Sequence, residues 1–234
     1  MKVRLKFRKY GNMKFIGHLD MMRYFQKAIR RSGIPVCYSE GFSPHMIMSF
    51  ASPLGVGLTS DGEYLDIEVN GELSPAMAVK RLNETGAEGV EVLSLQKIPD
   101  GKASNAMALV TAADYRVSFR EGCAPAGGWQ ERFSEFLKQP SIFILKETKK
   151  NTRELDIRPL IYEARCGDDC VFLKLAAGSA ENLKPELVME AFASYSKTSF
   201  PEFAFLIHRL ELYADGKTQG GPRFVPLSDL GEAF

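Results

Sequence analysis

The sequence lacks any apolar run close to the roughly 18 residues that a membrane-spanning helix needs. Its first ten residues, MKVRLKFRKY, contain no apolar core followed by a cleavage site, so no secretory signal is predicted. Cysteine is scarce, with four residues in 234, and their spacing shows no disulfide framework. We therefore expect a cytoplasmic protein that makes no contact with a membrane.

Signatures of a bound cofactor are also missing. Cys166 and Cys170 are separated by three residues, but two thiols do not complete a tetrahedral zinc site. No C-x3-C-x2-C run is present to hold a radical-type iron–sulfur cluster, and no Walker sequence or GxSxG elbow occurs. These absences lead us to expect no metal, no cofactor and four ordinary thiols.

The composition is that of an ordinary globular protein, with 45% apolar and 25% charged residues. Hydrophobic periodicity predicts the order β-α-β-β-α-β in the first hundred residues, which is the ferredoxin-like order. The pattern of the first strand and of the second helix recurs about 110 residues later. The predicted fold class is therefore α+β, a tandem of two ferredoxin-like units.

Composition also places the domain boundaries. The predicted parts are an N-terminal basic unit over 1–100, a linker over 101–113, a C-terminal unit over 114–215 and an irregular tail over 216–234. In the second unit, 142–146 and 171–176 are predicted as the two middle strands, with 151–165 as an extra segment between them.

Positive charge is concentrated at the start of the chain. Residues 1–31 contain ten Lys or Arg residues and one acid, Asp20, whereas the remaining residues carry a net charge of −8. Such asymmetry is typical of a surface that faces a polyanion. One basic row lies on the first strand, on the sheet face predicted to be open, and another follows the first helix. The predicted RNA contacts are Arg4, Lys6, Arg8, Arg23, Lys27 and Arg30.

A structural explanation of the strand row stays open at this point. The neighbouring predicted strand places Tyr64, Asp66 and Glu68 on the same face, where cross-strand ion pairs would neutralise the row. A second domain could also cover that face. The two explanations differ in whether these cations are available to a partner.

Two histidines are candidates for general acid or base catalysis near neutral pH. His18 begins the first helix, and His45 ends a loop, 39–45, that is dense in polar and aromatic residues. No third catalytic group accompanies either residue in the sequence. A capping or packing role is therefore an alternative for both.

Several sequence blocks resemble the radical-SAM-linked domain of unknown function in bacteria. These are FIGHLD (15–20), AIRRSGIP (28–35), YSEGFSPH (38–45), PLGVG (53–57), GEY (62–64) and DIRP (156–159). The resemblance covers about residues 1–215, and it departs at Met46-Ile47, where the family often has Pro and Lys. It implies a radical SAM protein as partner, because members are fused to one or encoded beside one. The motif residues that it assigns to a common pocket are Gly17, His18, Asp20, Tyr38, Gly41, Phe42, Pro44, His45, Glu63, Asp156 and Arg158.

Three functions are compatible with this sequence. The leading hypothesis is an accessory protein that binds RNA or a ribonucleoprotein and presents it to a radical SAM enzyme, which supplies the chemistry. The second is a metal-independent endoribonuclease, similar in plan to the CRISPR repeat-processing enzymes, with His18 as the acid or base. The third is a protein-interaction module whose basic surface binds an acidic partner and no RNA.

Overall fold

The computed structural model describes residues 1–125, 127–147, 152–216 and 224–234, and it is an α+β structure. The chain forms two compact units. The first unit consists of Met1–Ala112 together with Arg209–Phe234, and the second consists of Ala113–His208. In the described part of the chain, no helix has the length and apolar character needed to cross a membrane.

The first unit contains a sheet in which β1 is central. Its strands and helices are β1 (Lys2–Lys9), α1 (His18–Ser32), β2 (Met48–Phe50), β3 (Thr59–Glu68), α2 (Pro75–Thr85) and β4 (Val90–Ile98). Strand β1 pairs antiparallel with β3 on one side and with β4 on the other, and β2 pairs with β3. Alternating apolar residues explain β1, where Val3, Leu5 and Phe7 are buried in the core.

Helix α1 packs on this sheet in a different rotation from the one expected. In the sequence, Leu19, Met22, Phe25 and Ile29 recur at helical spacing, which predicts that these four residues form the buried side of the helix. In the structure Met21 takes the inward place, and 67% of Leu19 is exposed. Because Leu19, Met21 and Met22 are all apolar, the sequence pattern alone does not decide which of them faces the sheet.

The second unit also combines a sheet with two helices. Its elements are β5 (Val110–Phe119), α4 (Trp129–Leu137), β6 (Phe143–Glu147), β7 (Thr152–Asp156), β8 (Ile161–Cys166), β9 (Cys170–Ala176), α5 (Pro185–Tyr195) and β10 (Phe205–Asp215). The boundary between the units falls inside β5 and β10. The strand order in this unit is β10-β5-β9-β8, and its core includes Phe133, Phe136 and Phe192.

The pairing of the middle strands in the second unit corrects the sequence prediction. The strand beside β9 is β8, whereas the predicted strand at 142–146 is β6, which pairs with β7 in a separate two-stranded sheet. The segment 151–165 was expected to be an extra segment between the middle strands, yet it contains β7 and most of β8. Apolar content misled the prediction, because Phe143 and Leu145 lie exposed on β6.

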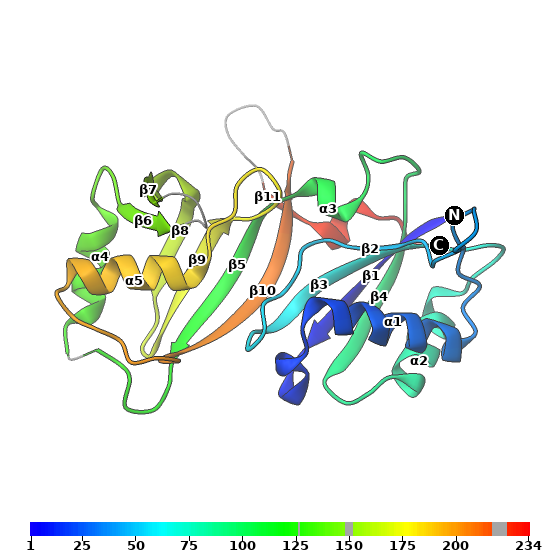
Figure 1. Cartoon of the computed structure of the whole chain (residues 1–234), viewed down its shortest axis with the longest axis horizontal. Coiled ribbons are helices and arrows are strands. Elements are labelled where there is room, and N and C mark those ends of the chain that lie inside the picture. Colours follow the sequence, from blue (N-terminus) through cyan, green and yellow to red (C-terminus); the bar gives the residue numbers. More distant parts are fainter. Residues whose placement is uncertain (126, 148–151, 217–223) are drawn as a thin grey trace. The chain divides into compact units, whose positions relative to one another are not determined.

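The tail and the linker also differ from expectation, because both contain regular structure that packs on the first unit. In the described part of the tail, β11 (Phe224–Pro226) pairs with β10, and Glu232 forms a bridge with Lys97 on β4. The linker contains a short helix, α3 (Ala106–Leu109). Figure 1 shows α1 and α2 on one side of this unit's strands and α3 with the red C-terminal segment on the other.

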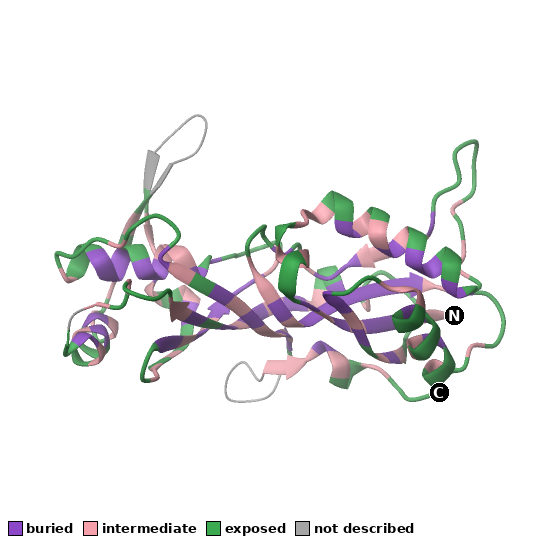
Figure 2. Cartoon of the chain, turned by 90° about the horizontal axis from the view of Figure 1, so that it is seen from below, coloured by how far each residue is buried: buried purple, intermediate pink, exposed green. Residues whose placement is uncertain are grey.

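Both faces of the first unit's sheet are therefore covered. Strand β3 is buried without interruption from Gly62 to Ile67, whereas a half-covered strand would alternate between buried and exposed residues. In Figure 2 the strands of this unit are purple over much of their length. The prediction that the basic row of β1 lies on an open face is wrong, because the chain's own α3 and C-terminal segments cover it.

Candidate functional site

Arg4, the first predicted RNA contact, belongs to an internal ion pair. Its guanidinium donates to both carboxylate oxygens of Asp66 at 2.7 and 3.0 Å, and the two side chains are only 1% and 7% exposed. It also donates to the carbonyl oxygens of Ser104 and Leu227. A cation with this set of partners ties β1 to β3, to the linker and to the tail. It is not available to a phosphate group.

The other two RNA contacts predicted on β1, Lys6 and Arg8, are also ion-paired. The Lys6 ammonium lies 2.5 Å from a carboxylate oxygen of Glu211, whose other oxygen accepts a hydrogen bond from the Tyr64 hydroxyl at 2.6 Å. Burial and the Glu211 charge raise the pKa of Tyr64 above its usual range. Arg8 lies 3.3 Å from Asp61 and from Glu91, in half-exposed pairs. The structural explanation, in which ion pairs neutralise the row of cations on β1, therefore fits this face of the sheet.

The helix cations have different surroundings. Arg23, Lys27 and Arg30 are all exposed, on the side of α1 opposite its buried residues Met21 and Phe25. Arg23 pairs with Asp20 at 2.9 Å in a solvated i,i+3 pair, whereas Lys27 and Arg30 have no ion-pair partner among the described residues. We call Leu19, Arg23, Lys27 and Arg30 the α1 ridge. Figure 2 shows the solvent side of this helix in green and its sheet side in purple.

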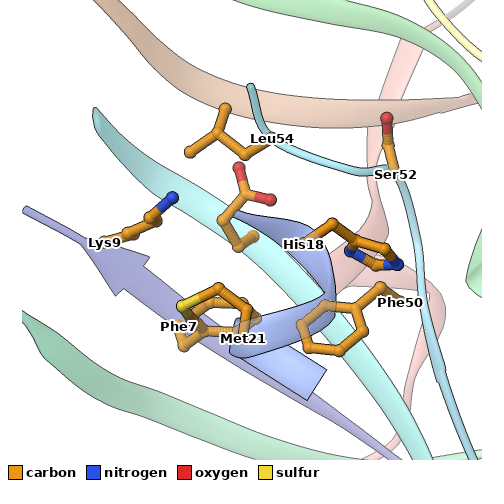
Figure 3. Close-up of a pocket in the computed structure, with 8 residues that line it drawn as sticks. Phe7, Lys9, His18, Met21, Phe50, Ser52 and Leu54 are labelled. Atoms are coloured by element: carbon orange, nitrogen blue, oxygen red, sulfur yellow. The ribbon is translucent and has the colours of Figure 1, made fainter. Parts of the chain in front are cut away.

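Three of the sequence motifs meet at the start of α1. Gly17 precedes the helix at its N-cap position, and a side chain there would lie 3.8 Å from Val56 of the PLGVG segment. The N–H of Gly57 donates to the carbonyl oxygen of Lys14 at 2.7 Å. A small pocket lies beneath this junction (Figure 3). Its lining residues are Phe7, Lys9, His18, Met21, Phe50, Ser52, Leu54 and Glu63.

The two charged groups of this pocket, Lys9 and Glu63, both have partners outside its lining. Glu63 accepts two hydrogen bonds from Arg209, at 2.7 and 2.6 Å, in a buried pair. The Lys9 ammonium donates to the carbonyl oxygen of Ile16 at 2.7 Å. Burial lowers the pKa of Lys9, while the Glu63 carboxylate opposes part of that shift. The cavity measures about 10 Å³, which is room for roughly one water molecule.

His18 is therefore held in a site that cannot admit a nucleotide in this conformation. Its ring contacts Phe50 edge to face, with centroids 5.2 Å apart. In Figure 3 His18 and Lys9 approach the pocket from different sides, one from α1 and the other from β1. His45 does not line this pocket, so the two catalytic candidates are not brought together there.

The loop 39–45 forms the end of a protruding hairpin. Its neighbours Tyr38 and Met46 form a bridge, the Ser39 N–H donates to the carbonyl oxygen of His45 at 2.8 Å, and the Ser39 hydroxyl lies 2.8 Å from Nδ1 of His45. The tip contains Gly41 in the left-handed region at φ 104°. Phe42 at this tip is fully exposed. Tyr38, Gly41, Phe42, Pro44 and His45 are all exposed, and none of them lines the pocket at His18.

Asp156 and Arg158 belong to the second unit, where their contacts are structural. The Asp156 carboxylate accepts hydrogen bonds from the N–H groups of Ile142 and Arg158, and these bonds hold the pKa of Asp156 below its usual range. The Arg158 guanidinium donates to the carbonyl oxygens of Leu137 and Ile161. Asp156 and Arg158 thus lie in the second unit, whereas the other motif residues of the implied pocket lie in the first.

The sequence profile of one bacterial protein family matches residues 2–185, which is most of the chain. This chain belongs to that family. The family is described as "Uncharacterized protein conserved in bacteria (DUF2344)". No curated protein matches this DUF2344 chain.

Among solved structures, the DUF2344 chain is similar to one from "Crystal Structure of a Cbf5-Nop10-Gar1 Complex", with 10% identity and a TM-score of 0.46. The likeness covers 90% of this chain and 48% of that one, so the DUF2344 chain spans about half the length of the structure it matches.

Several residues at or near this candidate site were not predicted from the sequence. Lys9 was counted among the cations of the first segment, yet it is buried in the pocket beside His18. Arg209 lies 146 residues from its partner Glu63, and no local pattern connects two such positions. Phe15 belongs to the FIGHLD block but was not among the predicted site residues, although 63% of it is exposed, three residues before α1 begins.

Proposed function

We propose that this protein binds RNA or a ribonucleoprotein through the α1 ridge and serves as an accessory protein to a radical SAM enzyme. The observation that carries the proposal is the row of exposed cations on α1, two of which have no ion-pair partner among the described residues. In this proposal the partner enzyme performs the modification or processing.

Selective neutralisation of the other cations supports this assignment. Among the cations of β1, three are ion-paired, Lys9 is buried and Lys2 donates hydrogen bonds to two neutral oxygens, so the exposed cations without an ion-pair partner within the described ranges are concentrated on α1. From Arg23 to Arg30 the helix rises about 10.5 Å, so the three cations form one linear track of positive charge along α1. Three cations on this spacing suit a phosphate backbone and carry no sequence information.

The test is a charge-removal variant with a matched control. The triple variant Arg23→Gln/Lys27→Gln/Arg30→Gln is compared with Arg120→Gln/Lys184→Gln/Lys197→Gln, which removes three exposed cations of the second unit. Binding of a 20-nucleotide RNA is measured from 50 to 300 mM salt. We expect the ridge variant alone to bind at least about tenfold more weakly, and to reduce the slope of log affinity against log salt by about 2.

Equal losses in the two triple variants would contradict the RNA half of the proposal, since net charge alone would then explain binding.

The partnership with a radical SAM enzyme has its own support, which is the resemblance to a radical-SAM-linked family. The pocket at His18 has room for roughly one water molecule, and this favours chemistry in a partner over chemistry at His18. Co-expression with a bacterial radical SAM protein of the kind that is fused to, or encoded beside, members of the family it resembles tests this partnership. We expect co-purification that survives ribonuclease treatment, and separate elution would refute it.

The finer description of the fold is also a proposal, namely that the two units are tandem ferredoxin-like units. In the first unit the strand order is β4-β1-β3 with β2 on β3, and in the second it is β10-β5-β9-β8. Both orders follow the ferredoxin-like scheme if the β6–β7 hairpin is an insertion between α4 and β8. An experimentally determined structure with the two helices of either unit on opposite faces of its sheet would exclude this description.

A further inference from the structure

We infer that the RNA bound at the α1 ridge is single-stranded, and that one of its bases stacks on Phe15. This inference rests on the proposed function and adds the class of RNA that the site selects. It comes from an exposed aromatic ring at the N-terminal end of the ridge.

The Phe15 ring has one face occupied by its own chain. The Lys14 ammonium lies 5.1 Å from the ring centroid, in a cation–π contact. The ring is nevertheless 63% exposed, so much of its remaining surface faces solvent. A base stacked on the open face would complete a sandwich of ammonium, ring and base, with the cation also close to the phosphate of that nucleotide.

The backbone around Phe15 is fixed before any ligand binds. Phe15 ends a 3-10 helix over Gly11–Phe15, and the N–H of Ile16 donates to the carbonyl oxygen of Met13 at 3.0 Å. The carbonyl oxygen of Lys14 accepts the N–H of Gly57 from a distant segment at 2.7 Å. A ring presented by a held backbone loses less entropy on binding than one at a loose chain end.

Two further exposed apolar residues lie at the start of α1. Leu19, the first residue of the ridge, is 67% exposed, and Val56, beside Gly17, is 61% exposed. The Cα atoms of Phe15 and Arg23 are at most about 18 Å apart by chain reach, within the span of a strand of four nucleotides or more. Arg23 neutralises Asp20, the one acid among the first 31 residues, so the charge at this surface remains positive.

Aromatic surface next to a basic track distinguishes single strands from duplexes. Bases of a single strand can leave their stack and lie on a side chain, whereas those of an A-form duplex stay inside it and offer only groove edges. A duplex can use the cations of the ridge but not the face of Phe15. A protein partner would also cover apolar surface, but the adjoining cations favour an anionic strand.

The experiment measures binding of labelled 12-nucleotide oligouridylate and of a 12-base-pair RNA duplex by fluorescence polarisation. The variants are Phe15→Ala and Phe15→Trp, and the control is Phe143→Ala, which removes a ring of similar exposure (58%) from the second unit. We expect Phe15→Ala to weaken oligouridylate binding by about 5- to 150-fold and to leave duplex binding unchanged. Phe15→Trp should retain or strengthen it, because indole also stacks.

The outcomes separate this inference from the proposed function. If Phe15→Ala binds oligouridylate like the wild type while the ridge triple variant binds it more weakly, stacking is overturned and RNA binding stands. If the wild type binds neither the oligouridylate nor the duplex, both the stacking inference and the proposed RNA binding are refuted. If Phe15→Ala loses only the co-purifying radical SAM protein, the ring belongs to a protein interface and the inference is overturned. Unchanged circular dichroism of Phe15→Ala would show that a loss reflects the missing ring.

Discussion

The buried pair between Arg4 and Asp66 allows a quantitative test of the structural role of the β1 cations. In Asp66→Asn the side chain keeps its shape, but the Arg4 guanidinium loses its counter-charge in a site that is almost fully buried. Removing one partner of a buried ion pair costs about 3–5 kcal/mol of folding free energy. Domains are stable by about 5–15 kcal/mol in total, so this loss is a large share.

The double variant Arg4→Met/Asp66→Leu makes the prediction sharper, because it leaves no unpaired charge. Apolar replacement of a whole buried pair is often neutral, although here the carbonyl oxygen of Ser104 and the N–H of Ala106 also lose their partners. We expect the double variant to lose less unfolding free energy than the sum of the losses in Arg4→Met and Asp66→Leu alone, by at least about 2 kcal/mol.

The assay is urea unfolding followed by circular dichroism, with Arg8→Met as control. Arg8 lies on the same strand, but its pairs are half-exposed and are expected to contribute only about 0–1 kcal/mol. A loss in Asp66→Asn no larger than that in Arg8→Met would refute the argument and return Arg4 to the candidate phosphate contacts. RNA affinity of Arg4→Met, measured where the protein is folded, should equal that of the wild type.

Three further predictions concern other parts of the chain. Gly62→Ala should lower the free energy of unfolding by about 1–3 kcal/mol, since a Cβ there would lie 2.7 Å from Cα of Glu211; an unchanged urea midpoint would show that the strands can separate. Asp156→Asn should flatten the acid limb of the stability curve: the lowered pKa of Asp156 contributes stability above its unfolded value of about 3.9, which is lost as pH falls through the folded value, so identical acid melts would contradict the stated cause. Alkylation of Cys166, followed by peptide mass spectrometry, should keep accelerating up to about pH 11, because burial raises the pKa of this thiol to about 11; a plateau near pH 9 would disprove it.

Helices and strands could be predicted from the sequence where the spacing of apolar residues fitted only one kind of element. Helix α5 begins at Pro185 and ends at Tyr195, as its pattern predicts, because Pro suits the first helical turn and apolar residues recur on one side. The rotation of α1 was not accessible, because Leu19 and Met21 are both apolar and only packing decides which one is buried. Strand β6 was misassigned for a related reason, since apolar residues on a hairpin can also face solvent.

Long-range contacts decide most of what the sequence could not show about the site. Whether the strand cations were exposed depended on Glu211 and on the tail, more than 200 residues from β1. The helix cations were easier to interpret, because their exposure follows from the position of Phe25 and Ile29 on the opposite side of the same helix. Their role in RNA binding stays a prediction.

The division of the first unit between both ends of the sequence has a consequence for synthesis on the ribosome. Lys6 and Glu63 emerge early, but their partners Glu211 and Arg209 follow only after the 96 residues of the second unit. At about 5–20 residues per second, the N-terminal strands wait roughly 5–20 s for the segment that neutralises and covers them. The inserted unit, continuous in sequence, can fold during that interval. Substitutions that slow elongation there should increase proteolysis of the nascent N-terminal sheet.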